Sequence, residues 1–108
     1  MKIIVADTSP LISLAIIDKL DLLLEIFDEV YIPQQVYQEI IFDLTKPKAN
    51  LLADFFKDKI KKIDNADELS LFVDKGEGEA IILAKEIHAD YLLIDGFKGR
   101  TVAENLNI

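Results

Sequence analysis

The chain has 108 residues, with 20 Asp and Glu against 12 Lys and Arg, and a formal net charge of −8. This length is typical of one domain, so we expect residues 1–108 to form a single domain. The 51% hydrophobic content excludes a disordered chain, and the lack of cysteine excludes disulfides and thiolate metal sites. The acidic balance argues against broad, charge-driven binding to nucleic acid, although metal ions held by carboxylates reverse the local charge.

The apolar segments do not have the length of a membrane span. Charged residues interrupt every apolar run before it reaches the ~20 residues that a spanning helix needs. The first residues also lack the charged start, apolar stretch and cleavage site of a signal peptide. We therefore expect a cytoplasmic protein that does not interact with membranes.

Strands and helices are expected to alternate along the chain. Apolar and β-branched runs predict strands at residues 2–6, 29–32, 59–64 and 91–95. Apolar residues at helical spacing predict helices at 10–27 with a break between 18 and 21, then at 33–44, 49–57, 69–74, 79–87 and 98–106. This order predicts an α/β fold around a central parallel sheet of four strands.

Two of the predicted strands end on an acid. Asp7 follows the run IIVA, and Asp95 follows the run YLLI. Ligands of open parallel sheets bind at the carboxyl ends of the strands. If the two strands are neighbours, their carboxylates meet at one edge of the sheet.

Further acids are expected on the helices. Glu39 lies in VYQEI, and Glu77 and Glu79 lie in GEGEAI at the start of a helix. Packing several carboxylates together costs several kcal/mol unless cations compensate their charge. Mg²⁺ and Mn²⁺ are hard ions that prefer oxygen ligands, so they are the natural occupants of such a cluster.

Each acid also has a purely structural interpretation. Asp7 is a good helix N-cap, and Glu77 favours a helix N-terminus because of the helix dipole. Glu39 has the spacing of an exposed helix position, and Asp95 followed by glycine is typical of a turn. These alternatives stay open for the acids taken one at a time.

Four motifs, taken together, resemble a known family. They are ADTSPLISLAIIDKLDLL, EVYIPQQVYQEI, DKGEGEAIILAKE and YLLIDGFKGRTVAENL, and they cover nearly the whole chain. Their order and spacing resemble those of the PIN domain family, and more narrowly its VapC-like branch with DTSPLI, GEAEA-like and LLID-x-x-KGR motifs. The resemblance implies a three-layer α/β/α fold with the first strand between the second and fourth. It also implies a metal-dependent endoribonuclease, toxin-like or RNA-processing, that hydrolyses phosphodiesters with a metal-activated water.

The resemblance also implies which residues carry the chemistry. Asp7, Glu39, Glu79 and Asp95 match the four catalytic acids that hold Mg²⁺ or Mn²⁺, and Glu77 is a further candidate ligand. With Asp7 as a metal ligand, there is a reason for the buried first strand to end on a carboxylate.

Residues beside these acids are assigned supporting roles. Thr8 and Ser9 are expected to orient Asp7 or a bound water from the second shell. Lys98 and Arg100 are the candidates for phosphate contact. The partners that the resemblance implies are an RNA substrate, an antitoxin protein, and a second copy of the chain in a homodimer or a higher oligomer.

Two departures from the family pattern favour an alternative function. The position after Asp95 is Gly96, where this branch has a second acid, and the chain stops at Ile108 before the expected fifth edge strand. Both features favour a catalytically degenerate PIN-like module that binds a partner or dimerises. A phosphoacceptor signalling domain is a weaker alternative, because a single acid follows the first strand.

Lysines cluster in the middle of the chain. Lys46 and Lys48 flank Pro47, and Lys57, Lys59, Lys61 and Lys62 follow. They either guide RNA toward the acids or form a solvated face, and the second interpretation is the more common for a run of charges.

Overall fold

The computed structural model describes residues 1–64 and 74–94 of the chain. The helices and strands follow in the order β1 (Ile3–Ala6), α1 (Thr8–Ile16), α2 (Leu22–Ile26), β2 (Glu29–Pro33), α3 (Gln34–Ile41), α4 (Ala49–Phe56), β3 (Ile60–Lys61), α5 (Lys75–Glu86) and β4 (Tyr91–Leu93). The helices predicted at 69–74 and 98–106 fall largely or wholly outside the described residues. None of the helices described is long and apolar enough to cross a membrane.

The four strands form one parallel sheet in the order β3-β2-β1-β4. In β1, Ile4 pairs with Val30 of β2 on one side and with Tyr91 of β4 on the other. The first strand therefore lies between the second and the fourth, as the sequence analysis expected. The α/β class and the parallel sheet are confirmed.

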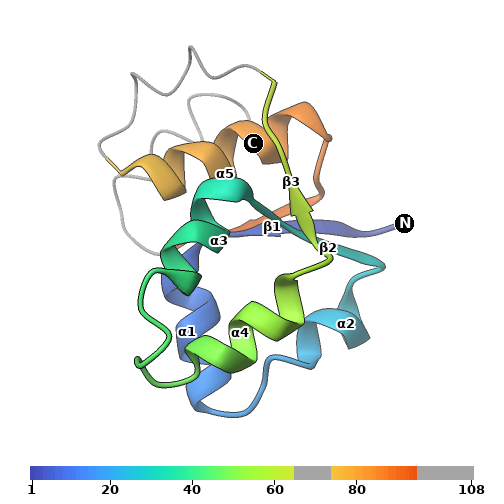
Figure 1. Cartoon of the computed structure of the whole chain (residues 1–108). Coiled ribbons are helices and arrows are strands. Elements are labelled where there is room, and N and C mark those ends of the chain that lie inside the picture. The colour runs from blue at the N-terminus through green and yellow to red at the C-terminus, as the bar shows by residue number, and fades with distance from the viewer. Residues whose placement is uncertain (65–73, 95–108) are drawn as a thin grey trace.

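Helices cover both faces of the sheet (Figure 1). Successive side chains of a strand point to opposite faces, so β1 contributes Ile4 and Ala6 to one core and Val5 to the other. The larger core packs against α1 to α4 and contains the fully buried Phe56. The smaller core lies under α5 and contains Leu83. The result is a three-layer arrangement of helix, sheet and helix.

The break predicted after the first helix is confirmed. Helix α1 is followed by Asp18 in the left-handed region with φ 56°. Its N–H donates to the carbonyl of Ala15, and the N–H of Lys19 donates to the carbonyl of Leu14. Helices commonly end on a residue in this conformation, and aspartate tolerates it better than most side chains. The chain can then turn and begin α2.

Strand β3 is shorter than predicted. The sequence suggested a strand over residues 59–64, but the ladder includes Ile60 and Lys61 alone. Its partner strand ends at Pro33, which has no N–H to donate to a continuing ladder. Pairing with β2 therefore stops at that residue.

Helix α5 begins earlier than predicted, at Lys75 instead of Glu79. The side chain of Asp74 accepts a hydrogen bond from the N–H of Glu77 at 3.0 Å, and Asp74 is thus the N-cap. The helix lies almost wholly inside the protein from Gly76 to Ala84. The sequence also predicted a helix over residues 69–74. This prediction is wrong at Asp74, whose backbone is extended with φ −97° and ψ 120°, and the other residues of that segment lie outside the described residues.

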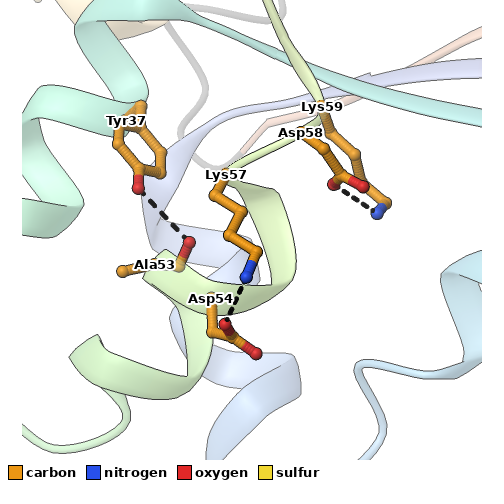
Figure 2. A network of polar contacts seen from close by, with 6 residues as sticks. All are labelled: Tyr37, Ala53, Asp54, Lys57, Asp58 and Lys59. Atoms are coloured by element: carbon orange, nitrogen blue, oxygen red, sulfur yellow. Dashed lines mark hydrogen bonds and ion pairs between the residues drawn. The ribbon is translucent and has the colours of Figure 1, made fainter.

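A hydrogen bond connects α3 to α4, and two ion pairs form at the end of α4 and in the loop that follows it (Figure 2). The hydroxyl of Tyr37 donates to the carbonyl of Ala53 at 3.3 Å. Lys57 pairs with Asp54 at 3.1 Å, and Lys59 pairs with Asp58 at 3.0 Å. These ion pairs lie at the surface, where each adds little stability.

Candidate functional site

Asp7 follows β1 directly and is nearly buried, with 7% of its surface exposed. Its carboxylate accepts a hydrogen bond from the N–H of Thr8 at 2.8 Å and caps α1. Its own N–H donates to the carbonyl of Leu93 on β4 at 2.9 Å. The interpretation of Asp7 as an N-cap is therefore correct, and the same residue also lies at the edge where β1 and β4 end.

Glu39 comes from α3 and reaches toward the end of β1. The hydroxyl of Thr8 donates to its Oε1 atom at 3.4 Å. On its other side, the carboxylate lies against the Cα of Gly76 in α5, where a Cβ atom would come within 2.9 Å of Glu39 Cδ. A side chain at this position would occupy the place of the carboxylate, so the flexible end of Glu39 would have to move.

Glu79 comes from the buried face of α5 and has 9% of its surface exposed. Its Oε1 atom accepts a hydrogen bond from the N–H of Gln35 at 3.1 Å. Gln35 is in the first turn of α3, where backbone N–H groups have no partner within the helix. Glu79 therefore joins α5 to the start of α3, the helix that carries Glu39.

The pKa of Glu39 shows that these carboxylates act on one another. The pKa of Glu39 is raised from 4.5 to about 7, first by burial of the carboxylate and then by the negative charges of Asp74, Asp7 and Glu79 in that order. The hydrogen bond from Thr8 acts in the opposite direction. An exposed helix position, the alternative for Glu39, does not agree with this environment. Tertiary structure has brought together an acid that follows β1, an acid on α3, and acids at the N-cap and in the first turns of α5.

Asp74 is the acid that sequence analysis missed. Its spacing to Glu77 resembles a capping box, which would have predicted the N-cap of α5. Its effect on Glu39 has no signature in the sequence, because the two residues are 35 positions apart and meet only through the packing of α3 on α5.

The other predicted residues differ in how the structure places them. Glu77 lies in the first turn of α5, half-buried, and donates its N–H to Asp74. Ser9 is exposed, and its carbonyl accepts a hydrogen bond from the hydroxyl of Ser13 at 3.3 Å. Thr8 makes the contacts to both Asp7 and Glu39. Asp95, Lys98 and Arg100 lie outside the described residues.

The predicted lysine cluster makes local contacts. Lys57 and Lys59 pair with acids, and Lys59 also lies 4.9 Å from the centre of the Phe55 ring. Lys61 lies 4.6 Å from the centre of the Tyr31 ring. Such contacts are those of a solvated face. Lys46 differs, because it lines a hollow next to Glu39.

Comparison with known proteins decides the family. A family model described as PIN domain matches residues 3–108. The chain belongs to the PIN domain family. PIN domains are in general nucleases and typically use divalent metals. No curated protein and no solved structure matches the chain significantly.

The donors of this PIN domain can be tested for their fit to a divalent metal. They are all carboxylates, which is the chemistry that Mg²⁺ and Mn²⁺ prefer. After burial, the negative charges of Asp74, Asp7 and Glu79 contribute to the raised pKa of Glu39, and a cation would relieve this repulsion. Within residues 1–64 and 74–94, no three acidic or histidine side chains are arranged so that they could hold a metal ion as they stand. The chemistry of the described donors fits, although their spacing is not that of a closed metal site.

Proposed function

We propose that this PIN domain is a Mg²⁺- or Mn²⁺-dependent endoribonuclease of the toxin-like or RNA-processing kind. The observation that carries the proposal is the meeting of Asp7, Glu39 and Glu79, which contributes to raising the pKa of Glu39 to about 7. Membership of a family of nucleases supports it. We call Asp7, Glu39 and Glu79 the acid cluster. Its negative charge disfavours binding of the negatively charged RNA backbone unless cations lie between the acids and the phosphates.

In this proposal Asp7, Glu39, Glu79 and Asp95 hold the metal, with Glu77 as a further ligand. When bound, the divalent cations supply activation of water and stabilisation of the charge that develops on the phosphodiester. Asp7 is held by the N–H of Thr8, and Glu39 is held by its hydroxyl. Thr8 thus orients two of the acids and keeps them ready for the cation.

The proposal assigns the remaining roles outside the acid cluster. Lys98 and Arg100 contact phosphates of the RNA, and Ser9 supports Asp7 from the surface. A cytoplasmic location, an antitoxin partner and a homodimer or a higher oligomer stay predictions that accompany this function. The alternative, a degenerate PIN module that binds a partner without cleaving RNA, differs in that it needs no metal.

Thermal unfolding with and without Mn²⁺ tests the proposal without knowledge of the substrate. A ligand that binds only the folded state at 100 times its Kd stabilises that state by about 2.7 kcal/mol. For a domain of this size we expect Mn²⁺ to raise the Tm of the wild type by roughly 10 °C. Asp7→Asn keeps an N-cap side chain but removes the charge, and it should lose most of this shift.

The matched control is Asp54→Asn, which removes an exposed charge on α4 far from the cluster in the sequence. It should keep the full Mn²⁺ shift. If the wild type gives no shift, or if Asp7→Asn keeps it, the metal-dependent nuclease is excluded and the interaction module is the better description. Cleavage of single-stranded RNA that stops on chelation then completes the test.

A further inference from the structure

A hollow of 180 Å³ adjoins the acid cluster on the side of α1, α3 and α4. Glu39 of the acid cluster lines this hollow, and so does Thr8, which donates a hydrogen bond to Glu39. The hollow is therefore continuous with the acid cluster. Its remaining walls include the apolar side chains of Ile12, Ile40 and Leu52. Pockets that enclose drug-sized ligands measure about 300–1,000 Å³. This hollow is smaller and suits a single ring system.

Polar groups line the hollow where it reaches the loop between α3 and α4. The Oδ1 atom of Asp43 accepts hydrogen bonds from the N–H of Thr45 at 3.0 Å and from its hydroxyl at 2.5 Å. The second carboxylate oxygen of Asp43 accepts no hydrogen bond from the residues that the structure describes. Thr45 holds the pKa of Asp43 below its ordinary value, so this side chain is a carboxylate at neutral pH. Lys46, also in the lining, adds a positive charge.

We propose that this hollow is a nucleobase subsite of the nuclease, in which Asp43 selects a pyrimidine that carries an amino group, namely cytosine. The inference rests on the proposed function, because the acid cluster is where the adjoining phosphate of the RNA would lie. Single-stranded RNA offers unstacked bases that proteins bind in such pockets. Apolar walls cover the faces of the ring, while Asp43 and Lys46 contact its edge and the backbone.

The chemistry of Asp43 explains the choice of base. Because Oδ1 is engaged by Thr45, one oxygen remains, and it accepts from a donor such as the amino group of cytosine. Uracil has a carbonyl oxygen at that position, which a carboxylate repels, and its one donor, N3–H, lies between two such carbonyl oxygens. Adenine also carries an amino group, but its two rings exceed the single ring that the hollow suits. Guanine presents two adjacent donors, which match a carboxylate with both oxygens available.

Titration of the protein with nucleosides, followed by NMR of the backbone amides, tests the subsite. Cytidine and uridine carry no phosphate, so their binding does not depend on a metal at the acids. In the wild type, cytidine should shift the amides of Thr45, Lys46 and Ile12 and should bind about tenfold more tightly than uridine, the value of one hydrogen bond to a charged group. Adenosine should bind more weakly than cytidine.

Asp43→Asn should reverse this preference. The amide oxygen of asparagine can keep both hydrogen bonds from Thr45, so its nitrogen then faces the base and donates to the carbonyl of uracil. We expect uridine to bind more tightly than cytidine in this variant. Asp54→Asn, on the exposed surface of α4, should keep the preference for cytidine.

The outcomes separate the subsite from the nuclease. If Asp43→Asn leaves the preference unchanged, or if no nucleoside shifts the amides around the hollow, the subsite is excluded, whatever Mn²⁺ does. If Mn²⁺ fails to stabilise the protein while cytidine binds with the expected reversal, the nuclease is excluded and the hollow stands as a nucleobase site. Stabilisation by Mn²⁺ together with the expected reversal of the cytidine preference supports the nuclease and the subsite.

Discussion

The carboxylate of Glu39 lies against the Cα of Gly76, although the two residues come from different helices. A Cβ atom on Gly76 would lie 2.9 Å from Glu39 Cδ and closer still to both carboxylate oxygens. Real Cβ atoms are almost never found within 3.0 Å of another heavy atom. The end of a glutamate side chain is flexible, so it would move before the backbone of α5 does.

Gly76→Ala should therefore displace Glu39 and leave the fold intact. Alanine favours a helix over glycine by about 0.8–1 kcal/mol, which offsets part of the cost of displacement. We expect the Tm without metal to change by only a few degrees and the stabilisation by Mn²⁺ to fall sharply. Thermal unfolding with and without Mn²⁺ measures both effects in one experiment.

A second variant tests whether the effect of Gly76→Ala acts through Glu39. In a Glu39→Ala background the added methyl group meets no carboxylate, so Gly76→Ala should then stabilise the protein by up to about 1 kcal/mol. If Gly76→Ala destabilises both backgrounds equally, the contact with Glu39 is not the reason that this position is a glycine.

Glu39→Gln should change how stability depends on pH. In the metal-free protein the folded-state pKa of Glu39 is about 7, against 4.5 for the ordinary value. Between these values the folded state binds more protons than the unfolded state, so this group lowers the free energy of unfolding as the pH rises. The destabilisation is absent below pH 4.5 and complete above pH 7.

The size of this effect follows from the shift. The difference between the pKa of about 7 and the ordinary 4.5 corresponds to roughly 3 kcal/mol in the free energy of unfolding. Solvent screening of the partly exposed carboxylate reduces this to about 1–2 kcal/mol. Glu39→Gln should thus be more stable than the wild type by that amount at pH 8 and equal to it at pH 4. Urea unfolding across this range measures the difference, and a constant difference would contradict the shift.

Asp74→Asn should lower the pKa of Glu39 toward 4.5. Asp74 makes the largest contribution to that pKa among the charged neighbours, and asparagine removes its charge while still capping α5. NMR titration of the Glu39 carboxyl carbon measures the change. Asp58→Asn, an exposed acid paired with Lys59, is the control and should leave this pKa unchanged. An equal effect of both substitutions would mean that Asp74 does not act locally.

Two phenylalanines of the same region should differ in their importance for stability. Phe56 is fully buried at the end of α4, whereas Phe42 has 88% of its surface exposed. Phe56→Ala should cost about 3–5 kcal/mol through the cavity that it leaves, and Phe42→Ala should change stability by less than about 0.5 kcal/mol. Urea unfolding of both variants measures the difference. A large cost for Phe42→Ala would mean that this side chain is covered in solution.

The fold could largely be predicted from the sequence because local patterns determine its elements. The run IIVA is apolar throughout and lies in the middle of the sheet, where both of its faces are buried. The helix break at Asp18 also has a local cause, the left-handed backbone that ends α1. The end of β3 and the start of α5 were predicted wrongly, because they depend on Pro33 in the partner strand and on the cap by Asp74.

Asp7, Glu39 and Glu79 could be recognised as candidate site residues from local motifs, because each follows or lies within one of them. The action of Asp74 on Glu39, and the room that Gly76 leaves for the Glu39 carboxylate, arise from the packing of α3 on α5. The hollow beside the acids also exists only where α1, α3 and α4 pack together. Charge and steric exclusion act through space, so neither follows from the order of residues along the chain.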